Sequence, residues 1–513
     1  MRRLVAAALV LTAGPASAGP RLARALEKAT SGPDYAHAFW GIAIADLKTG
    51  EAVYELNADK LFAPASATKL FSGAAALERL GPEFRFETRL HRRGEVQDGV
   101  LKGDLVLKAS GDPNLSGRSD AAGRLSFKDV DHIYAGFSAD AELTETDPLA
   151  GLDDLATQIT AAGIRRVEGE VLVDDRLFEG GEGSGSGPSR LTPIMVNDNV
   201  VDVLVTPASE VGRPASIAVR PATAYVQVEA RVLTVPAGGG TDVSVQPAGP
   251  YGFVVRGTIE AGRKPLLRSA PIQDPVAFAR ALLIESLGRR DVAVAASILS
   301  PPGHEALPAW DGYDRLPVVA SRVSAPFAEA LRIVEKVSHN LHASTLPLLV
   351  AVASGKRTLK DGLQEQGRIL AGLGVDVKSI SFGGGAGGAP GDQVTPRATV
   401  QLLRAMASRP AFAAYEASLP VLGVDGTLAK SVGLDSPARG RVKAKTGTLV
   451  WDDGMNGRFF LASKALAGYL ETRSGRRLAV AFFVNKTFVD SPDQTAREGK
   501  MLGRLCEIVV VEE

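Results

Sequence analysis

The N-terminal part of the chain shows two successive patterns of hydrophobic and polar positions. Residues 39–54 alternate around a polar turn at residues 48–50, which predicts a β-hairpin. A helical repeat then opens at Pro64-Ala65-Ser66 and continues to Leu80, before a Gly-Pro pair. Lys69 follows Ser66 by three residues, so we expect both side chains on one face of this helix.

From about residue 84 the pattern changes to short alternating segments separated by glycine-rich turns. One helical repeat interrupts them near residues 152–162, and residues 180–187 form a Gly/Ser loop of a kind that is typically mobile. Strands are predicted at residues 100–107, 167–173, 200–205, 224–232 and 253–259, the last three as antiparallel strands.

Helical periodicity returns at residues 275–287 and becomes regular from residue 325. Helices are predicted at residues 325–337, 341–353, 359–373, 395–408 and 497–509. Three further strands are predicted at residues 442–445, 466–472 and 478–485.

These patterns predict an α+β protein in more than one unit, because 513 residues are too many for a single core. We expect one domain that is split in two, residues 19–84 and 268–513, with strands supplied by both chain ends. Residues 85–267 would form a β-rich insertion of one or two small domains.

Composition excludes several functional classes. The 58 basic residues are balanced by 58 acidic ones without a basic run, so we expect no nucleic-acid partner. No segment after the first 18 residues has enough consecutive apolar residues for a transmembrane anchor. The single cysteine, Cys506, cannot form an internal disulfide.

The first 18 residues have the pattern of a secretory leader. Arg2 and Arg3 precede an apolar stretch at residues 4–13, and the small residues Ala16-Ser17-Ala18 form a cleavage site. The structural alternative is an apolar first helix. The leader predicts a periplasmic or secreted protein, cleaved near Ala18.

Ser66 and Lys69 form the only Ser-x-x-Lys in the chain. A lysine one helical turn from a serine can take its proton if burial suppresses the lysine's charge. The apolar stretch from Leu70 to Leu80 favours such burial. The alternative is an ordinary helix start with a solvated lysine.

Ser338-His339-Asn340 is the only Ser-x-Asn of the chain and lies between two apolar helices. Ser338 could pass a proton to a leaving group while Asn340 holds Lys69 or a substrate amide. The alternative is a helix cap, since Ser and Asn both favour helix ends. His339 and His342 could be bases or metal ligands, but the six histidines show no ligand spacing, and we expect no metal.

Lys-Thr-Gly occurs twice in the chain. Lys48-Thr49-Gly50 lies in the predicted hairpin turn, where a glycine with positive φ is explanation enough. The second copy, at residues 445–447, ends an alternating strand. There Lys445 and the hydroxyls of Thr446 and Thr448 could bind a substrate carboxylate, and Gly447 would let a substrate backbone approach. A second amine would also lower the pKa of Lys69.

Three motifs, namely Ser66-x-x-Lys69, Ser338-x-Asn340 and the Lys-Thr-Gly at residues 445–447, follow one another in this order and spacing. The sequence thereby resembles the penicillin-binding serine peptidases. Four stretches are similar to the class C low-molecular-mass D-alanyl-D-alanine carboxypeptidase/endopeptidases, namely residues 64–70, 109–115, 418–428 and 442–449. The long interval between Ser66 and Ser338 also fits this branch, which carries inserted domains there. The resemblance covers nearly the whole mature chain. It implies a penicillin-binding-protein/β-lactamase-like transpeptidase domain, an antiparallel sheet flanked by helices, with a large β-rich insertion.

The resemblance also implies a mechanism. Ser66 would attack the carbonyl of a D-Ala-D-Ala bond or a D-Ala–diaminopimelate cross-link in a peptidoglycan stem peptide. Lys69 would accept its proton, Ser338 would protonate the leaving amine, and the N–H groups of Ser66 and Thr448 would bind the oxyanion. β-Lactams would acylate Ser66 covalently, and no cofactor is implied.

Three features depart from the family pattern. Residues 383–388 are a glycine cluster without the usual serines, His339 replaces a common aspartate, and residues 450–463 look like an additional segment. The sequence leaves open which peptidase activity dominates, the role of the insertion and the oligomeric state. A β-lactamase or esterase, and a wall-binding protein with a decayed site, are the alternative functions.

Overall fold

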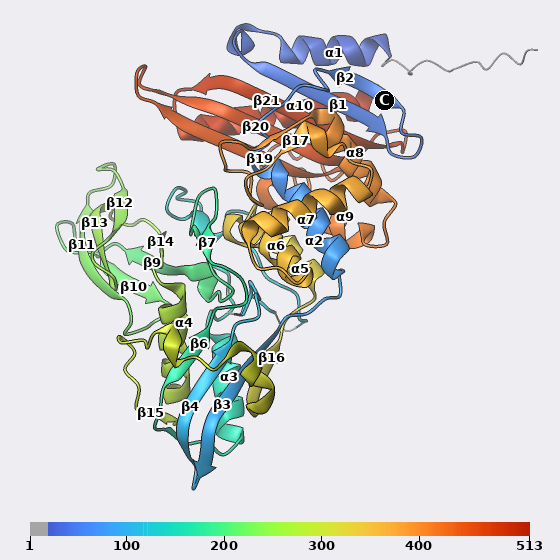
Figure 1. Ribbon diagram of the computed structural model, residues 1–513. Helices are drawn as coiled ribbons and strands as arrows, with labels where there is room; N and C mark the ends of the chain where they lie inside the picture. Colours follow the sequence, from blue (N-terminus) through green and yellow to red (C-terminus); the bar gives the residue numbers. More distant parts are fainter. Residues whose placement is uncertain (1–18, 116, 121) are drawn as a thin grey trace, which may run out of the picture.

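The computed structural model describes residues 19–513 except residues 116 and 121 (Figure 1). The predicted leader at residues 1–18 therefore lies outside the described residues. None of the described helices combines the length and the apolar character needed to span a bilayer.

A five-stranded antiparallel sheet with the order β19-β20-β21-β1-β2 forms one end of the molecule (Figure 1). Strand β1 lies between β2 and β21, so both chain ends contribute to one sheet, which confirms that part of the prediction. The strands are β1 (Phe39–Asp46), β2 (Ala52–Leu56), β19 (Val442–Asp453), β20 (Arg458–Glu471) and β21 (Arg477–Val489).

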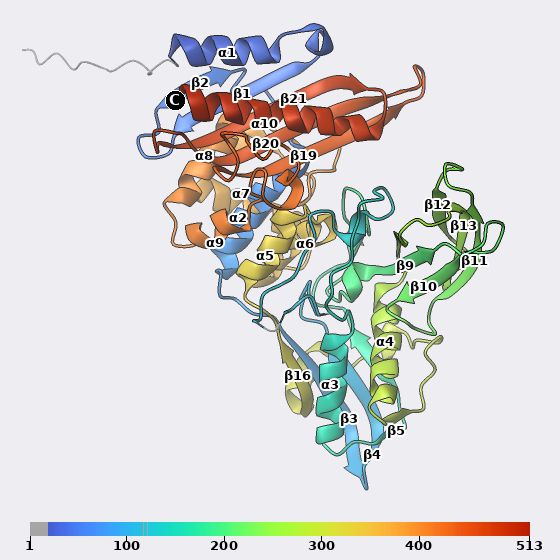
Figure 2. The same ribbon diagram turned by 180° about the vertical axis from the view of Figure 1, so that it is seen from behind.

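Strand β1 is apolar and buried on both sides, so both faces of this sheet must be covered. Ile42 and Ile44 pack in one core with helices α1 (Pro20–Thr30) and α10 (Thr495–Glu512), which lie side by side across the outer face (Figure 2). Ala43 and Ala45 face the opposite core, which consists mainly of helices.

Helix α2 (Thr68–Leu80) lies in the middle of this second core and is buried from Thr68 to Leu77. Its small and apolar side chains leave it no polar face in this stretch, so neighbouring helices can enclose it. The helices next to it are α5 (Phe327–Lys336), α6 (Asn340–Ala353), α7 (Leu359–Gly372) and α9 (Phe412–Ser418), and α8 (Pro396–Ala407) belongs to the same core. The N-terminus of α2 is therefore held in the interior.

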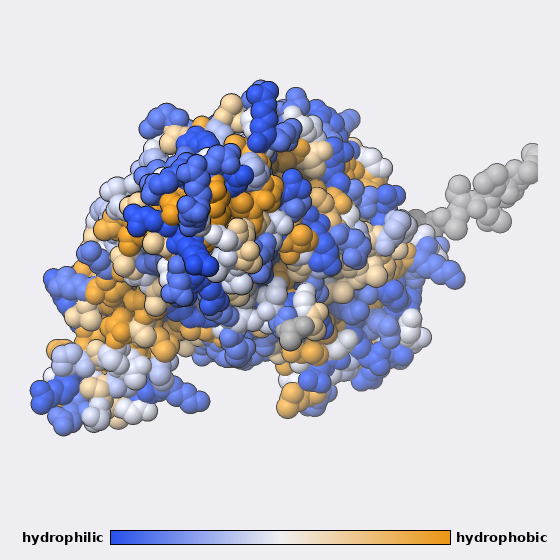
Figure 3. All heavy atoms as spheres, turned by 90° about the horizontal axis from the view of Figure 1, so that it is seen from below, coloured by the Kyte–Doolittle hydropathy of each residue, from blue (hydrophilic) through white to orange (hydrophobic). Residues whose placement is uncertain are grey.

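The inserted region begins with a six-stranded mixed sheet that packs against two helices. Its elements are β3 (Glu87–Gln97), β4 (Val100–Lys108), β5 (Arg166–Val167), β6 (Val171–Asp174), β15 (Ala293–Val294), β16 (Val318–Val323), α3 (Ala150–Ala161) and α4 (Pro275–Arg289). Viewed from below, hydrophilic residues cover most of the projecting parts of the molecule, and hydrophobic ones gather between them (Figure 3).

Two three-stranded sheets complete the inserted region, in the orders β10-β9-β14 and β11-β13-β12. Their strands are β9 (Val200–Thr206), β10 (Ser216–Arg220), β11 (Gln227–Val235), β12 (Asp242–Pro247), β13 (Gly252–Glu260) and β14 (Leu266–Pro271). The prediction of antiparallel strands was wrong for β11 and β13, which pair in parallel. Alternation of side chains identifies a strand but carries no information on the direction of its partner.

Two short hairpins reach the site described below, one from the inserted region and one from the helical core. They are β7 (Gly181–Glu182) with β8 (Arg190–Leu191), and β17 (Ile380–Ser381) with β18 (Gln393–Val394).

The strand pairing extends the inserted region beyond residue 267. The expected boundary falls within β14, which pairs with β9, and the next helix, α4, belongs to the core of the inserted region. Strand β16 pairs with β3. Helical periodicity at α4 reports a helix but not the core that it joins. We therefore infer that the inserted region runs from Glu87 to Val323.

The core of the inserted region provides a first prediction. Phe278 on α4 is 0% exposed there. Phe278→Ala should lower the free energy of unfolding by about 3–5 kcal/mol, because it leaves a cavity as well as losing apolar contacts. Urea denaturation measures the change. Phe137→Ala, at a side chain that is 78% exposed, is the control and should change it by less than about 0.5 kcal/mol. Equal losses in the two variants would contradict the core assignment.

Candidate active site

Ser66 and Lys69 meet at the start of α2. Ser66 lies in a 3₁₀ turn of residues Ala65–Ala67, and Ala65 has the uncommon φ of +48°. Lys69 is 0% exposed, and its Nζ lies 2.8 Å from Ser66 Oγ. The same Nζ donates hydrogen bonds to Asn340 Oδ1 at 2.7 Å and to the carbonyl oxygen of Ala386 at 2.8 Å. The predicted serine and lysine are therefore in direct contact.

The environment of Lys69 favours its neutral form. Burial is the main cause that holds the pKa of Lys69 well below its usual value, and the charge of Lys445 adds to it. The carboxylates of Glu335 and Asp392 oppose this effect. A neutral amine next to a serine hydroxyl can accept the proton of that hydroxyl.

Ser338 lies on the turn between α5 and α6 with a φ of +61°. Its Oγ accepts a hydrogen bond from Lys445 Nζ at 2.9 Å. Burial lowers the pKa of Lys445 to about 8, although the charge of Glu335 opposes the shift. The Tyr134 hydroxyl, from the inserted region, donates to the carbonyl oxygen of Ser338 at 2.6 Å. Lys445 thus contacts Ser338, as Lys69 contacts Ser66.

Asn340 joins the helical core to the inserted region. Its Oδ1 accepts from Lys69, and its Nδ2 donates to the carbonyl oxygen and to Oγ of Ser186 at 3.0 and 3.1 Å. Ser186 belongs to the predicted Gly/Ser loop, which forms the β7–β8 hairpin. The glycines and serines of this loop indicated only a mobile segment, so its contact with the site was not predicted. Its glycines and serines are the only local signal.

Strand β19 runs directly beside the turn that carries Ser66. A methyl group on Gly447 would lie 2.5 Å from the carbonyl oxygen of Pro64 and 3.1 Å from the backbone nitrogen of Ser66. Gly447 is therefore needed for the strand to approach the nucleophile turn, in addition to any approach of a substrate. Thr446 Oγ1 donates to Thr427 Oγ1 at 2.7 Å, and Thr448 Oγ1 accepts from Lys464 Nζ at 2.9 Å.

The glycine cluster at residues 383–388 packs against the same helix. Ser72 Oγ donates to the carbonyl oxygen of Gly385 at 2.8 Å, one residue before the carbonyl of Ala386 that Lys69 binds. A methyl group on Gly387 would lie 1.9 Å from the carbonyl oxygen of Ala65. The cluster is a tight turn next to the site.

The additional segment at residues 450–463 is the distal part of the β19–β20 hairpin. Trp451 and Met455 are exposed on it, and β21 accompanies it through the ring contact of Phe460 with Phe488.

Behind Ser338 lies a buried charged cluster, which we define as Arg118, Asp131, His132, Asp198, Asp202, His339 and His342. Asp198 is its centre. Its Oδ2 accepts from Arg118 at 2.5 Å and lies 2.8 Å from His132 Nε2, and its Oδ1 lies 2.8 Å from His342 Nε2 and 3.4 Å from His339 Nε2. Five of the seven residues come from the inserted region, which is therefore fixed to the Ser338–Asn340 turn.

The charges of this cluster stabilise one another. Burial opposes a charge on Asp198, but Arg118 and the neighbouring histidines hold the pKa of Asp198 well below its usual value. Burial alone would lower the pKa of His132, yet the carboxylates of Asp202, Asp131 and Asp198 raise it to about 10. Asp198 also belongs to a run of three left-handed residues, Asn197 to Asn199. The Asn-Asp-Asn sequence was a signal for an unusual turn.

The cluster contains two groups with the composition of a metal site, Asp198–His339–His342 and Asp131–His132–Asp198. In the first group the two imidazole rings are stacked, with centroids 3.6 Å apart and an interplanar angle of 12°, so their nitrogen lone pairs do not converge on one point. In the second, the Arg118 guanidinium already binds both carboxylates. We assign neither group to a metal.

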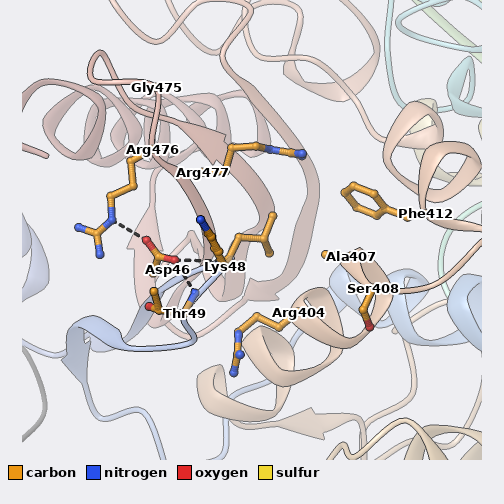
Figure 4. Close-up of a pocket in the computed structure, with 11 residues that line it drawn as sticks. Asp46, Lys48, Thr49, Arg404, Ala407, Ser408, Phe412, Gly475, Arg476 and Arg477 are labelled. Atoms are coloured by element: carbon orange, nitrogen blue, oxygen red, sulfur yellow. Dashed lines mark hydrogen bonds and ion pairs between the residues drawn. The ribbon is translucent and has the colours of Figure 1, made fainter. Parts of the chain in front are cut away.

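The first Lys-Thr-Gly, at residues 48–50, lies elsewhere, at a cavity of about 500 Å³ between the β1–β2 turn, α8 and the β20–β21 turn (Figure 4). Lys48 and Thr49 line this cavity with Arg404, Phe412 and Arg477. Gly50 has a φ of +81°, which agrees with the predicted turn. Neither Ser66 nor Lys69 lines the cavity, so this motif is not part of the site.

Comparison with known families agrees with this geometry. A sequence profile of the D-Ala-D-Ala carboxypeptidase 3 (S13) family matches residues 22–507. The chain belongs to the S13 family. It is thus a member of a serine peptidase family of hydrolases, which confirms the resemblance seen in the sequence.

Individual relatives span most of the S13 chain. The D-alanyl-D-alanine carboxypeptidase of Actinomadura sp. (strain R39) is 29% identical over 496 residues, which cover 91% of this chain and 81% of the relative. D-alanyl-D-alanine carboxypeptidase DacB of Haemophilus influenzae is 24% identical over 461 residues, 87% of this chain and 85% of that one.

A solved structure confirms the predicted fold class. Penicillin-binding protein 4 (dacB) of Haemophilus influenzae superimposes with a TM-score of 0.69 at 20% identity, over 95% of this chain and 99% of that one. Its complex with a β-lactam superimposes with a TM-score of 0.67 at 20% identity, with the same coverage of both chains.

The charged cluster provides a second prediction. Asp198→Asn removes the negative charge that the buried cations of Arg118 and His132 share. The free energy of unfolding should therefore fall by about 3–5 kcal/mol. Chemical denaturation at pH 7 measures the change. Asp242→Asn, at an exposed carboxylate of β12, is the matched control and should be nearly neutral. A fall of less than about 1 kcal/mol in Asp198→Asn would show that the cluster does not hold the inserted region.

Proposed function

We propose that this S13 protein is a D-alanyl-D-alanine carboxypeptidase of peptidoglycan that works through an acyl-enzyme on Ser66. The observation that carries the proposal is the 2.8 Å contact between Ser66 Oγ and Nζ of the fully buried Lys69. The names of the relatives, which are D-alanyl-D-alanine carboxypeptidases, supply the substrate class.

The first chemical step is acylation. Ser66 Oγ bonds to the carbonyl carbon of the D-Ala-D-Ala bond while its proton moves to the neutral amine of Lys69. The backbone N–H groups of Ser66 and Thr448 stabilise the oxyanion that forms. Support comes from Gly447, the residue before Thr448, because this part of β19 lies against the Ser66 backbone nitrogen.

Collapse of the tetrahedral intermediate breaks the C–N bond and requires a proton on the leaving amine. Ser338 is the donor in this proposal, and Lys445 can replace its proton, since Nζ already donates to Ser338 Oγ. In this proposal the proton gained by Lys69 is transferred to the neutral amine of Lys445, which restores both lysines. Water then attacks the ester carbon while Lys69 accepts a proton from the water, and Ser66 Oγ takes that proton as the ester C–O bond breaks.

Recognition of the substrate carboxylate falls to Lys445, Thr446 and Thr448. Lys464 supports this role, because its ammonium donates to Thr448 Oγ1 and adds a positive charge beside the binding hydroxyls. β-Lactams, which carry a carboxylate and a reactive carbonyl, would acylate Ser66 in the same position. The leader at residues 1–18 would deliver the enzyme to the periplasm or the cell exterior, where its substrate lies.

Cleavage of D-Ala–diaminopimelate cross-links is a further activity in this proposal, since the same bond type is broken. Products from purified muropeptides distinguish the two reactions by mass. Carboxypeptidase action removes one D-alanine, whereas endopeptidase action separates two stem peptides.

The acyl-enzyme leads to the third prediction. Ser66→Ala removes the nucleophile, so D-alanine release from stem peptides should fall by at least about 10³-fold and covalent labelling by a fluorescent penicillin should cease. Gel fluorescence and a D-alanine assay measure both. Ser31→Ala, at an exposed serine of the N-terminal segment, is the control. Labelling that survives in Ser66→Ala would exclude Ser66 as the nucleophile.

The lysine pair leads to the fourth prediction, a bell-shaped pH dependence of kcat/KM. Activity should rise as pH passes the lowered pKa of Lys69, because the base must be neutral. It should fall as pH passes about 8, because burial lowers the pKa of both Lys445 and Lys464 to about 8, and both then lose the charge that favours carboxylate binding. In Lys445→Met the alkaline limb should become shallower and KM should rise.

Lys430→Met, on an exposed lysine paired with Asp140, is the control and should keep both limbs. An alkaline limb that persists unchanged in Lys445→Met would assign it to another group.

A further inference from the structure

Glu335 is a buried acid next to the site that the mechanism above does not use. It lies on α5, three residues before Ser338, and is 0% exposed. Among the described residues, neither of its carboxylate oxygens has a hydrogen-bond partner. An ionised or neutral carboxyl group is costly to bury without partners, so its presence there calls for a reason.

The carboxyl group lies against the helix that carries Lys69. A methyl group on Gly73 would lie 2.9 Å from Glu335 Oε1 and 2.8 Å from Leu331 Cδ1. Gly73 follows Lys69 by four residues, one helical turn, and thus lies on the same face of α2. The missing side chain of Gly73 leaves the space that the Glu335 carboxyl group occupies.

The charged groups that act on Glu335 are the two lysines of the site. Lys69 on α2 and Lys445 on β19 both favour its ionised form, whereas burial opposes it and raises the pKa of Glu335 to about 7. On α9, Tyr415 is close enough for the charge of Glu335 to contribute to its raised pKa, but its hydroxyl donates to the carbonyl oxygen of Leu70.

Other charges near the site have partners of their own. On α5, Lys336 binds Asp425 at 2.7 Å and Arg332 binds Glu329 at 2.6 Å. Asp392, which also acts on Lys69, accepts from the backbone N–H groups of Gly383 and Ala389. Glu335 is therefore the carboxyl group that both lysines share.

We propose that the Glu335 carboxylate is the counter-ion for the ammonium that forms on Lys69 during acylation. This inference rests on the proposed function. When Ser66 transfers its proton, a positive charge appears on Lys69 close to the charge of Lys445, in the interior of the protein. The carboxylate stabilises that state and forms no bond to substrate. Glu335 acts through Lys69 and is a positioning residue, not a catalytic one.

Substitutions of Glu335 should affect the acylation rate and the thermal stability in different ways. Glu335→Gln removes the negative charge, so the pKa of Lys69 should fall and the ascending limb of the acylation rate should move to lower pH. A weaker base also takes the proton less readily, so acylation at pH 8 should slow about tenfold. Glu335→Met should slow it similarly but raise Tm, because an apolar side chain replaces an unpartnered buried acid.

The pH dependence of stability gives an independent readout. Because the pKa of Glu335 is raised from 4.5 to about 7, its ionisation destabilises the folded protein progressively as pH rises through that range. The Tm difference between Glu335→Met and the wild type should therefore be small below about pH 4.5 and largest above pH 7.

The experiment measures the acylation rate constant with a chromogenic cephalosporin from pH 5 to 10, together with Tm, for the wild type, Glu335→Gln and Glu335→Met. Asp174→Asn is the matched control, because Asp174 is a buried acid of the inserted region that is fully partnered by Arg176 and Tyr313. It should lower Tm and leave both pH limbs in place.

Slower acylation with an acid-shifted limb would support the proposal. An unchanged rate and limb in Glu335→Gln would overturn it, and so would a fall of Tm in both Glu335 variants, because that would make the carboxylate a structural contact. The proposed function fails separately, if Ser66→Ala is still acylated.

Discussion

The contact between Lys69 Nζ and Ser66 Oγ depends on a lysine that is kept in the interior with no carboxylate of the described residues in hydrogen-bond contact with its amine. A lysine in water would hold its proton at neutral pH and could not accept one from a serine. Burial of α2 on all sides removes the water, and two neutral oxygens, of Asn340 and of the Ala386 carbonyl, take the place of an ion-pair partner. Neutral acceptors orient the amine without fixing its charge, as a general base requires.

The need to bury Lys69 among neutral acceptors explains why several segments converge on the site. The Gly383–Gly388 turn must approach closely enough to offer a carbonyl oxygen, which its glycines permit. Gly447 lets β19 reach the turn of Ser66, and thereby brings Lys445 to Ser338. The left-handed conformations of Ala65 and Ser338 are the local cost of this convergence. Two residues with strained backbones flank a site that the packing of three layers holds in place.

Local pattern in the sequence was sufficient for the elements that carry the motifs. The helix after Ser66, the hairpin around Lys48 and the final strands all follow from periodicity and turn residues. The partners of those elements were not predictable in the same way. Ser186, Tyr134 and Asp198 reach the site from the inserted region, and nothing in their own neighbourhoods encodes a contact with Asn340, Ser338 or His342, respectively. The pairing of β16 with β3 and the parallel pairing of β11 with β13 are likewise tertiary, and the first is a reason why we infer an inserted region that extends beyond residue 267.

The inserted region therefore belongs to the site as much as the helical core does. A covering domain that only shaped access to substrate would need no buried charges at its contact. Here Asp198 connects Arg118 and His132 to the two histidines that begin α6, next to Ser338. Ion pairs that are fully buried contribute little net stability but penalise any arrangement that separates their members. The cluster consequently specifies one position of the inserted region relative to the Ser338–Asn340 turn. The β7–β8 hairpin is part of the inserted region and is therefore held in place with it. Ser186 on this hairpin can thus accept a hydrogen bond from Asn340, which orients Lys69.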